Sequence, residues 1–273
     1  MADFGYTISD TTFNVYRIDL ETLTAENVGT LSALAPQDLE GLGSEGTTIY
    51  AVEETVAADP ATGAPESAGD VLVFEAPTAA APDQQIAAME LVLDPAIPFG
   101  DEVGADFDSG SLFILRADAE GGSTLISVDP LTGAATQIGT SPNFADGLAI
   151  SSAGAFAVDF SGADTLYSLD VTTGALTAVG PLSADGATDF DADSGLGFTS
   201  EDQLIAFTED GNLYSVDTST GAAELLGNVT LGGAPLAEVD GGDLEGFTII
   251  ATPDIMVPGG DMMGMDMPNM PMV

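Results

Sequence analysis

Apolar and polar residues alternate in short paired segments that recur along the chain. Three of these segments align without gaps, at residues 125–139, 166–180 and 213–227. Each has one alternating stretch on either side of an Asp-x-x-Thr-Gly step. A period of two is typical of β-strands, and the glycine supplies the positive φ that a tight turn requires. The pattern predicts three β-hairpins, with a looser copy at 15–29 and a degenerate copy that starts at Val71.

A second unit recurs between these hairpins and aligns on one glycine. The aligned glycines are Gly41, Gly104, Gly147, Gly195 and Gly246, and a short strand pattern follows each of them. The last copy, at 243–250, stops after one strand, whereas the first hairpin, at 13–30, has no inner strand before it. Joining the two would complete one four-stranded sheet from both chain ends, which is the closure expected of a circular array.

The repeats predict an all-β fold, namely a β-propeller of five blades closed by the N-terminal hairpin and the C-terminal strand. The spacing of the copies is near the 40–50 residues that are typical of a propeller blade. Six blades remain an alternative, because residues 54–100 are long for one blade. Their Pro/Ala/Gly-rich part, 54–70, is expected to be an inserted loop. We therefore divide the chain into a propeller at 1–250 and a tail at 251–273.

The charge balance indicates a strongly acidic surface. The chain has 45 acidic residues and two basic ones, Arg17 and Arg116, which gives a formal charge of −43. Charged residues amount to only 17%, below the roughly 25% of an average soluble protein, so the imbalance reflects the removal of cations. Such self-repulsion must be screened by high salt, as in a halophilic or marine organism, or neutralised by bound calcium.

The missing residue types exclude several classes of function. There is no His, Cys, Lys or Trp, so Ser-His-Asp and Cys-His catalysis, tetrahedral zinc sites, Schiff bases and Walker-type phosphate loops are excluded. Nucleic acid is excluded as a partner because its binding requires Lys and Arg. No apolar run approaches the roughly 20 residues of a membrane span. Hydrolysis by two carboxylates, as in glycosidases, remains open.

Two inner units begin with the same short motif. They read Asp38-Leu-Glu40-Gly41 and Asp243-Leu-Glu245-Gly246. This motif resembles that of bacterial phytase-like and esterase-like β-propellers, whose channel carboxylates hold calcium. The resemblance implies the fold and calcium rather than an activity, because a phytase needs a basic cluster that two isolated arginines cannot supply.

The inner units also predict calcium ligands. Inner strands of a propeller line a central tunnel. The predicted ligands stand one or three positions before the aligned glycine, and they are Asp38, Glu40, Asp101, Asp146, Asp243 and Glu245. A ring of hard oxygen ligands suits Ca²⁺. The alternative is that these residues cap turns and face water.

A second candidate calcium site is a local loop. Asp189, Asp191 and Asp193 stand two residues apart and are followed by Gly195, which is similar to the first half of a calcium-binding loop. A shorter version runs from Asp106 through Asp108 to Gly110. A solvated turn is the alternative for both. The hairpin aspartates Asp129, Asp170 and Asp217 are interpreted as structural turn residues.

The tail has a different composition from the rest of the chain. It holds seven of the nine methionines, and the cluster consists of Met262, Met263, Met265, Met267, Met270 and Met272. Three interpretations compete: thioether ligands for Cu⁺, an apolar arm that docks on a protein partner or on the next subunit of a surface filament, and an unpartnered tail or export signal.

These features together predict a non-catalytic, calcium-stabilised acidic propeller. We expect it to be a binding or structural module outside the cell or at the cell surface, with the tail as a possible assembly element. No basic, apolar leader is recognisable at residues 1–5. The cytoplasm of a salt-accumulating cell is therefore the alternative location. The competing functions are a filament subunit, a carboxylate-based hydrolase and a copper-handling protein.

Overall fold

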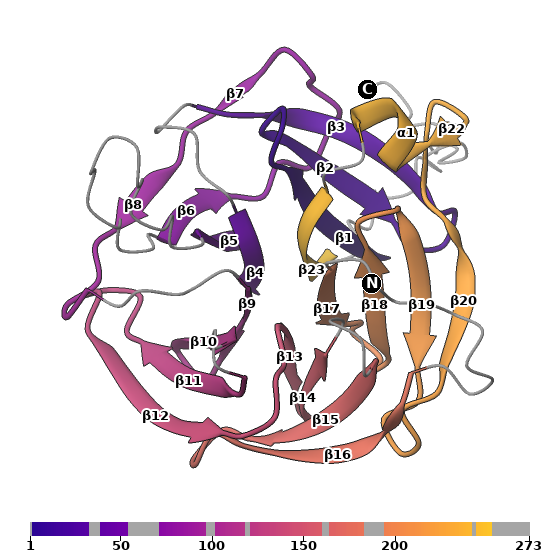
Figure 1. Cartoon of the computed structure of the whole chain (residues 1–273). Coiled ribbons are helices and arrows are strands. Elements are labelled where there is room, and N and C mark those ends of the chain that lie inside the picture. The colour runs from indigo at the N-terminus through magenta and orange to yellow at the C-terminus, as the bar shows by residue number, and fades with distance from the viewer. Residues whose placement is uncertain are drawn as a thin grey trace, which may run out of the picture.

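The alternating segments form antiparallel sheets arranged around a common axis in a computed structural model of the chain (Figure 1). The structure describes residues 2–32, 39–53, 71–96, 102–117, 121–159, 164–182, 194–241 and 244–252. Within these ranges there are five sheets: four have four strands each, and the fifth has seven, of which four follow one another from the hub outward.

The sheet that we call the closing sheet combines both ends of the chain. From the hub outward it consists of β23 (Leu244–Thr252), β1 (Ala2–Ser9), β2 (Asn14–Asp19) and β3 (Thr24–Leu31). Strands β23 and β1 pair from Ala2 and Thr252 at one end to Ser9 and Leu244 at the other. Both chain ends therefore build one sheet, as the repeat pattern predicts.

One strand of the closing sheet was not predicted from the sequence. The repeat pattern predicts strand 243–250 next to the hairpin at 13–30, whereas β1 lies between them and pairs with both. Strand β1 takes the place that β5 holds in the neighbouring sheet. Strand β23 also continues to Thr252, two residues past the predicted end of the propeller.

The other four sheets are named after their inner strands. The β4 sheet consists of β4 (Leu39–Glu45), β5 (Thr48–Glu53), β6 (Val71–Glu75) and β8 (Met89–Leu91). The β9 sheet consists of β9 (Val103–Asp108), β10 (Ser111–Ala117), β11 (Ser123–Val128) and β12 (Ala135–Ser141). The β13 sheet consists of β13 (Gly147–Ser151), β14 (Gly154–Asp159), β15 (Thr165–Asp170) and β16 (Ala175–Pro181). The β17 sheet consists of β17 (Ser194–Phe198), β18 (Leu204–Thr208), β19 (Asn212–Val216) and β20 (Ala223–Asn228).

Short elements lie outside these four-stranded sheets. Strands β7 (Gln85–Ile86) and β21 (Thr230–Leu231) pair with β3, and β22 (Ala234–Pro235) pairs with β21. Helix α1 (Leu236–Asp240) follows β22. In the part of the chain that the structure describes, no helix has the length and apolar character needed to cross a bilayer.

The five inner strands contact one another in a closed order. Strand β23 contacts β4, which contacts β9, and the contacts continue through β13 and β17 back to β23. Figure 1 shows these strands nearest the axis, with β12, β16, β20 and β3 at the rim. This arrangement is that of a β-propeller.

Apolar side chains fill the space between each pair of neighbouring sheets. One buried cluster joins the closing sheet to the β4 sheet through residues such as Tyr6, Ile8 and Phe74. Four further clusters occupy the other junctions around the ring. The alternating pattern of the sequence therefore buries one face of each sheet against the next sheet.

The aligned glycines bring the inner strands into backbone contact. A Cβ built on Gly104 would lie 2.6 Å from Leu148 N of the next inner strand, and one on Gly41 would lie 3.0 Å from Val103 O. Any larger residue there would push neighbouring sheets apart. The glycine column of the repeat is therefore a steric requirement of the hub.

The two glycines of the hairpin repeat have separate roles. Gly174 has a φ of +72° in the turn that Asp170 opens, where Asp170 Oδ1 accepts a hydrogen bond from Thr172 N (2.8 Å). The second glycine, Gly139 of β12, lets the Thr173–Gly174 turn of the next sheet pack against it. Asp129 and Asp217 accept equivalent hydrogen bonds, so the interpretation of the three aspartates as turn residues is confirmed.

Replacing Gly104 with alanine tests the hub packing. We expect G104A to lower the free energy of unfolding by about 3 kcal/mol or more, because the methyl group meets backbone that cannot rotate away. G46A is the matched control, since Gly46 has open space around it and only its φ of +61° costs about 1 kcal/mol. Urea unfolding measures both. Equal losses in the two variants would contradict the hub contact.

Candidate cation-binding site at the ring closure

The structure describes three of the predicted metal ligands: Glu40, Asp146 and Glu245. The remaining ones lie outside the described residues, namely Asp38, Asp101, Asp243, Asp189, Asp191 and Asp193. The tail methionines and the proposed loop at 54–70 lie outside them as well. The interpretations of these segments therefore stay predictions.

Glu40 and Glu245 come together with a third carboxylate, Asp10. One carboxylate oxygen from each residue lies within 4.8 Å of the other two. Asp10 follows the end of β1, Glu40 is the second residue of β4, and Glu245 is the second residue of β23. The group therefore unites both chain ends with the neighbouring β4 sheet.

A β-bulge occurs at the Glu-Gly step of both inner strands. In β4 the register shifts between Leu39 and Gly41, so Glu40 has no partner residue on β5. In β23 the register shifts next to Glu245, which is opposite Ile8. Bulges bend a strand and redirect its side chains, which explains how the two glutamates leave the regular alternation and converge.

Gly246 allows the close approach of the two strands. Its φ is +56°, and a Cβ at this position would lie 2.8 Å from Glu40 O. Only glycine adopts this backbone conformation here without strain or collision. The Asp-x-Glu-Gly motif thus combines a ligand with the residue that lets this ligand reach its counterpart.

Asp10 is held in place by backbone groups of both strands. Its Oδ1 accepts a hydrogen bond from Leu39 N (3.1 Å), and Ser9 before it pairs with Leu244. Thr7 Oγ1 also donates to Glu245 O (3.0 Å). Asp10 was not predicted as a ligand, because β1 was not predicted. The signal available in the sequence was the alternation of apolar residues at 2–9, which Asp10 follows.

Asp146 has the same place in the repeat but a different environment. It precedes β13, whose pairing with β14 begins at Gly147, and its N–H group donates to Val158 O (3.0 Å). Its Oδ1 accepts a hydrogen bond from Gly147 N (2.9 Å). Asp146 is not in the group of carboxylates with Asp10, Glu40 and Glu245. The predicted ring of ligands is therefore found only in part among the described residues.

The axis of the propeller is nearly closed at the level of the glycines. The cavity there measures about 10 Å³ and is lined by all five inner strands, including Gly104, Gly147 and Gly195. A water molecule needs roughly this volume. The expected open tunnel is absent at this level of the described structure, because the glycines let the backbones meet.

The charges of the group need neutralisation. Glu245 is only 5% exposed, and its carboxylate lies beside two others. Close carboxylates with little access to water repel one another, so a cation bound between them would stabilise their charged forms. Arg17 does not serve this purpose, because it forms its ion pair with Glu26 (2.8 Å). Three hard oxygen donors suit calcium better than a soft metal.

Asp106 bridges two inner strands. The carboxylate accepts hydrogen bonds from Ile150 N of β13 (2.6 Å) and from Phe107 N (2.8 Å). Burial raises its pKa to about 7, although both N–H donors act in the opposite direction. Asp108 lies in the same strand, and Ser109 and Gly110 form the β9–β10 turn. The segment is therefore part of a β-hairpin, with Asp106 as a bridge between sheets.

Comparison with known proteins shows likeness of fold only. No family profile and no curated protein matches the chain. Among solved structures, TolB from Acinetobacter baumannii is 14% identical, with a TM-score of 0.48 over 88% of this chain and 52% of its own. The Malassezia sympodialis allergen Mala s 1 is 14% identical, with a TM-score of 0.46 over 80% of this chain and 76% of its own. YCF48, solved with a D1 peptide, is 14% identical, with a TM-score of 0.41 over 83% of this chain.

The chain spans only 64% of the length of YCF48. What these proteins bind is therefore no guide to what this chain binds. The resemblance to phytase-like and esterase-like propellers, which rests on the Asp-x-Glu-Gly motif, stays a prediction.

Replacing Asp106 with asparagine should change how stability depends on pH. The native carboxyl holds its proton up to about pH 7, whereas the unfolded one loses it near pH 4, so this group makes the protein less stable as pH rises between these values. The slope is at most about 1.4 kcal/mol per pH unit. Urea unfolding at pH 5 and pH 8 should show D106N gaining stability relative to the wild type at pH 8. The control is D83N, at an exposed position. Its free energy of unfolding should depend on pH in the same way as that of the wild type.

Proposed function

We propose that the protein is a non-catalytic acidic β-propeller that calcium stabilises at Asp10, Glu40 and Glu245. Its role is that of a binding or structural module outside the cell or at the cell surface. The convergence of three carboxylates from three separate segments, within 4.8 Å, is the observation that carries the proposal. Extracellular calcium modules work at 10⁻⁴–10⁻³ M, which is compatible with a site of only three carboxylates.

The position of the group gives the ion a structural task. Glu245 belongs to the last strand, Asp10 follows the first strand, and Glu40 belongs to the neighbouring sheet. A cation bound by all three ties together parts of the ring that no short turn connects. It would also offset part of the repulsion in a chain of formal charge −43.

We propose five blades for the complete ring. The contacts of β23, β4, β9, β13 and β17 return to their starting point, and Val71–Glu75 and Met89–Leu91 complete the β4 sheet. A sixth blade would have to interrupt one of these contacts.

A structural role for the carboxylates also fits their surroundings better than hydrolysis does. The axial cavity beside Glu40 and Gly246 has a volume of about 10 Å³, which excludes a sugar or an ester from this position. A hydrolase that uses two carboxylates must place its substrate between them. The packed hub thus supports the non-catalytic role.

Calcium should raise the melting temperature through this site. An ion at 100 times its Kd stabilises the native state by about 2.7 kcal/mol. At roughly 2–4 °C per kcal/mol for a chain of this size, the gain is about 5–10 °C. Thermal unfolding with EGTA and with calcium, at equal ionic strength, measures it.

Two variants distinguish calcium bound at this site from calcium that only screens the surface charge. E245Q should lose the calcium response, whereas E201Q, at an exposed position outside the group, should keep it. An equal response in both variants would contradict the site, because calcium would then act only on the surface charge.

A further inference from the structure

The closing sheet lacks a covalent link that every other sheet has. A short turn joins the first and second strands elsewhere, as between Glu45 of β4 and Thr48 of β5. In the closing sheet these two strands are β23 and β1, which lie at opposite ends of the chain. Hydrogen bonds and packing alone hold this seam, so the ring can open here without unfolding a turn.

The connector from β6 to β8 crosses from the β4 sheet to the closing sheet. Ala81 N donates to Asn27 O (3.0 Å), and Thr30 N donates to Gln84 O (2.9 Å). Strand β7 then runs parallel to the end of β3, where Thr30 pairs with Gln85. The buried side chain of Ile86 fixes this contact.

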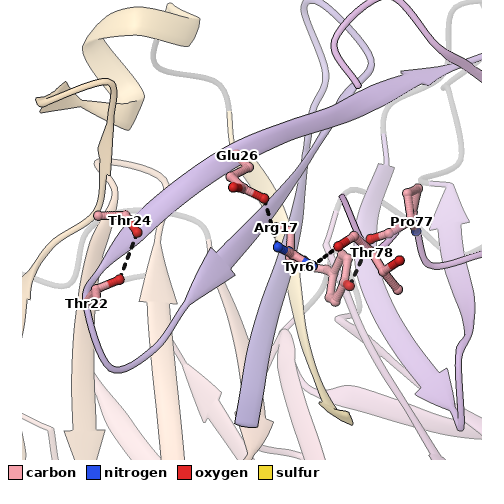
Figure 2. Close-up of polar contacts among 7 residues, drawn as sticks. All are labelled: Tyr6, Arg17, Thr22, Thr24, Glu26, Pro77 and Thr78. Carbon is pink, nitrogen blue, oxygen red and sulfur yellow. Dashed lines mark hydrogen bonds and ion pairs between the residues drawn. The ribbon is translucent and has the colours of Figure 1, made fainter. Parts of the chain in front are cut away.

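Arg17 fastens the same connector from the middle of the sheet. Figure 2 shows its guanidinium group between Thr78 and Glu26: one nitrogen donates to Thr78 O, and the other forms the ion pair with Glu26. The group also lies 4.5 Å from the centre of the Phe4 ring. A planar guanidinium has enough donors for both partners and can stack on the ring as well.

Tyr6 adds a second bond to the connector. Its hydroxyl donates to Pro77 O (3.0 Å), next to the Arg17 contact (Figure 2). Burial raises the pKa of Tyr6 to about 12, so the hydroxyl remains a donor at any ordinary pH. Tyr6 of β1 and Arg17 of β2 are paired residues of the sheet. The two side chains that bind the connector therefore lie next to each other.

A second connector holds the other end of β3. Thr230 N donates to Leu23 O (3.0 Å), and β21 runs parallel to Thr24 and Ala25. At the end of α1, Asp240 Oδ1 accepts a hydrogen bond from Tyr16 OH (2.5 Å). Single backbone contacts of a related kind occur at other outer strands: Asp94 forms an isolated parallel bridge with Ala134 before β12, and Ala223 N of β20 donates to Leu182 O (2.8 Å). Among the described residues, β3 differs in that whole short strands pair with it at both ends.

Arg17 departs from the residue that the other hairpins of the repeat have at this position. In the aligned hairpins the residue two positions before the turn aspartate is Ser127, Ser168 or Ser215, and in the closing sheet it is Arg17. A chain with only two basic residues thus has one of them where its other hairpins have serine. A local role at the seam explains this departure.

We propose that the two connectors are clasps that lock the closing sheet to its neighbours, with Arg17 as the positioning residue that attaches the first clasp, which belongs to the β4 sheet, to the closing sheet. The clasps replace the missing turn between β23 and β1 and oppose opening of the seam under the repulsion of the acidic chain. This function needs no bound ion and stands independently of the calcium site.

Hydrogen exchange of the full chain, with EGTA present, tests the clasp. R17S restores the serine of the other hairpins and is therefore compatible with the fold. We expect amides of β1, β23 and β7 to exchange about 10-fold faster in R17S, while β13–β16 stay unchanged, because local opening precedes global unfolding. R17K keeps the positive charge, but a lysine cannot contact Thr78 and Glu26 at the same time as the guanidinium group does. It should therefore accelerate exchange in these strands less than R17S does.

Two controls complete the test. Q203E adds one negative charge at an exposed position and should leave exchange at the seam unchanged. Y6F removes the bond to Pro77 and the contact of the hydroxyl with Arg17, and it should accelerate exchange in the same strands as R17S does. The proposal is overturned by unchanged exchange in R17S, by equal acceleration in all sheets, or by the same acceleration in Q203E.

Discussion

The fold depends on the antiparallel pairing of β1 with β23, which turns a linear series of sheets into a ring. Each sheet buries one face against the next, so an open series would leave two apolar faces in water. The pairing removes both faces at once. It also creates the one sheet whose inner strands no turn connects. The candidate cation site and the two clasps both lie on this sheet, which indicates that closure is where the molecule needs added support.

Several carboxylates of the described residues accept hydrogen bonds from backbone N–H groups, which replace the cationic partners that the sequence lacks. Asp129, Asp170 and Asp217 accept hydrogen bonds from groups of their own turns, and these bonds lower the pKa values of the three carboxyls. The largest cause is the hydroxyl of Thr172 at Asp170, the hydroxyl of Ser219 at Asp217 and the N–H group of Leu131 at Asp129. Asp106 accepts an N–H group of the next sheet. Acidic residues thus serve both solvation and the architecture. Arg17 differs from them, because its guanidinium group donates to a carbonyl and to a carboxylate, contacts that no carboxylate could make.

The candidate site was predictable in part. Glu40 and Glu245 stand out in the sequence because each precedes a glycine of the inner repeat, and the structure brings these two together. Asp146 has the same place in the repeat but is not in this group of carboxylates. Asp10 has no motif around it and enters the group only through the pairing of Ser9 with Leu244. A motif shows which residues are equivalent, whereas the local register decides where their side chains point.

The sequence by itself determined the class of fold, the hairpins with their Asp-x-x-Thr-Gly turns, and the use of both chain ends in one sheet. These features follow from periodicity and turn chemistry, which act between residues close in the chain. Only the tertiary structure decided that glycines close the axis, that bulges converge at Glu40 and Glu245, and that Arg17 reaches Thr78. The physical reason is that these features arise from contacts between segments far apart in the chain, where a shift of one residue in register reverses the direction of a side chain.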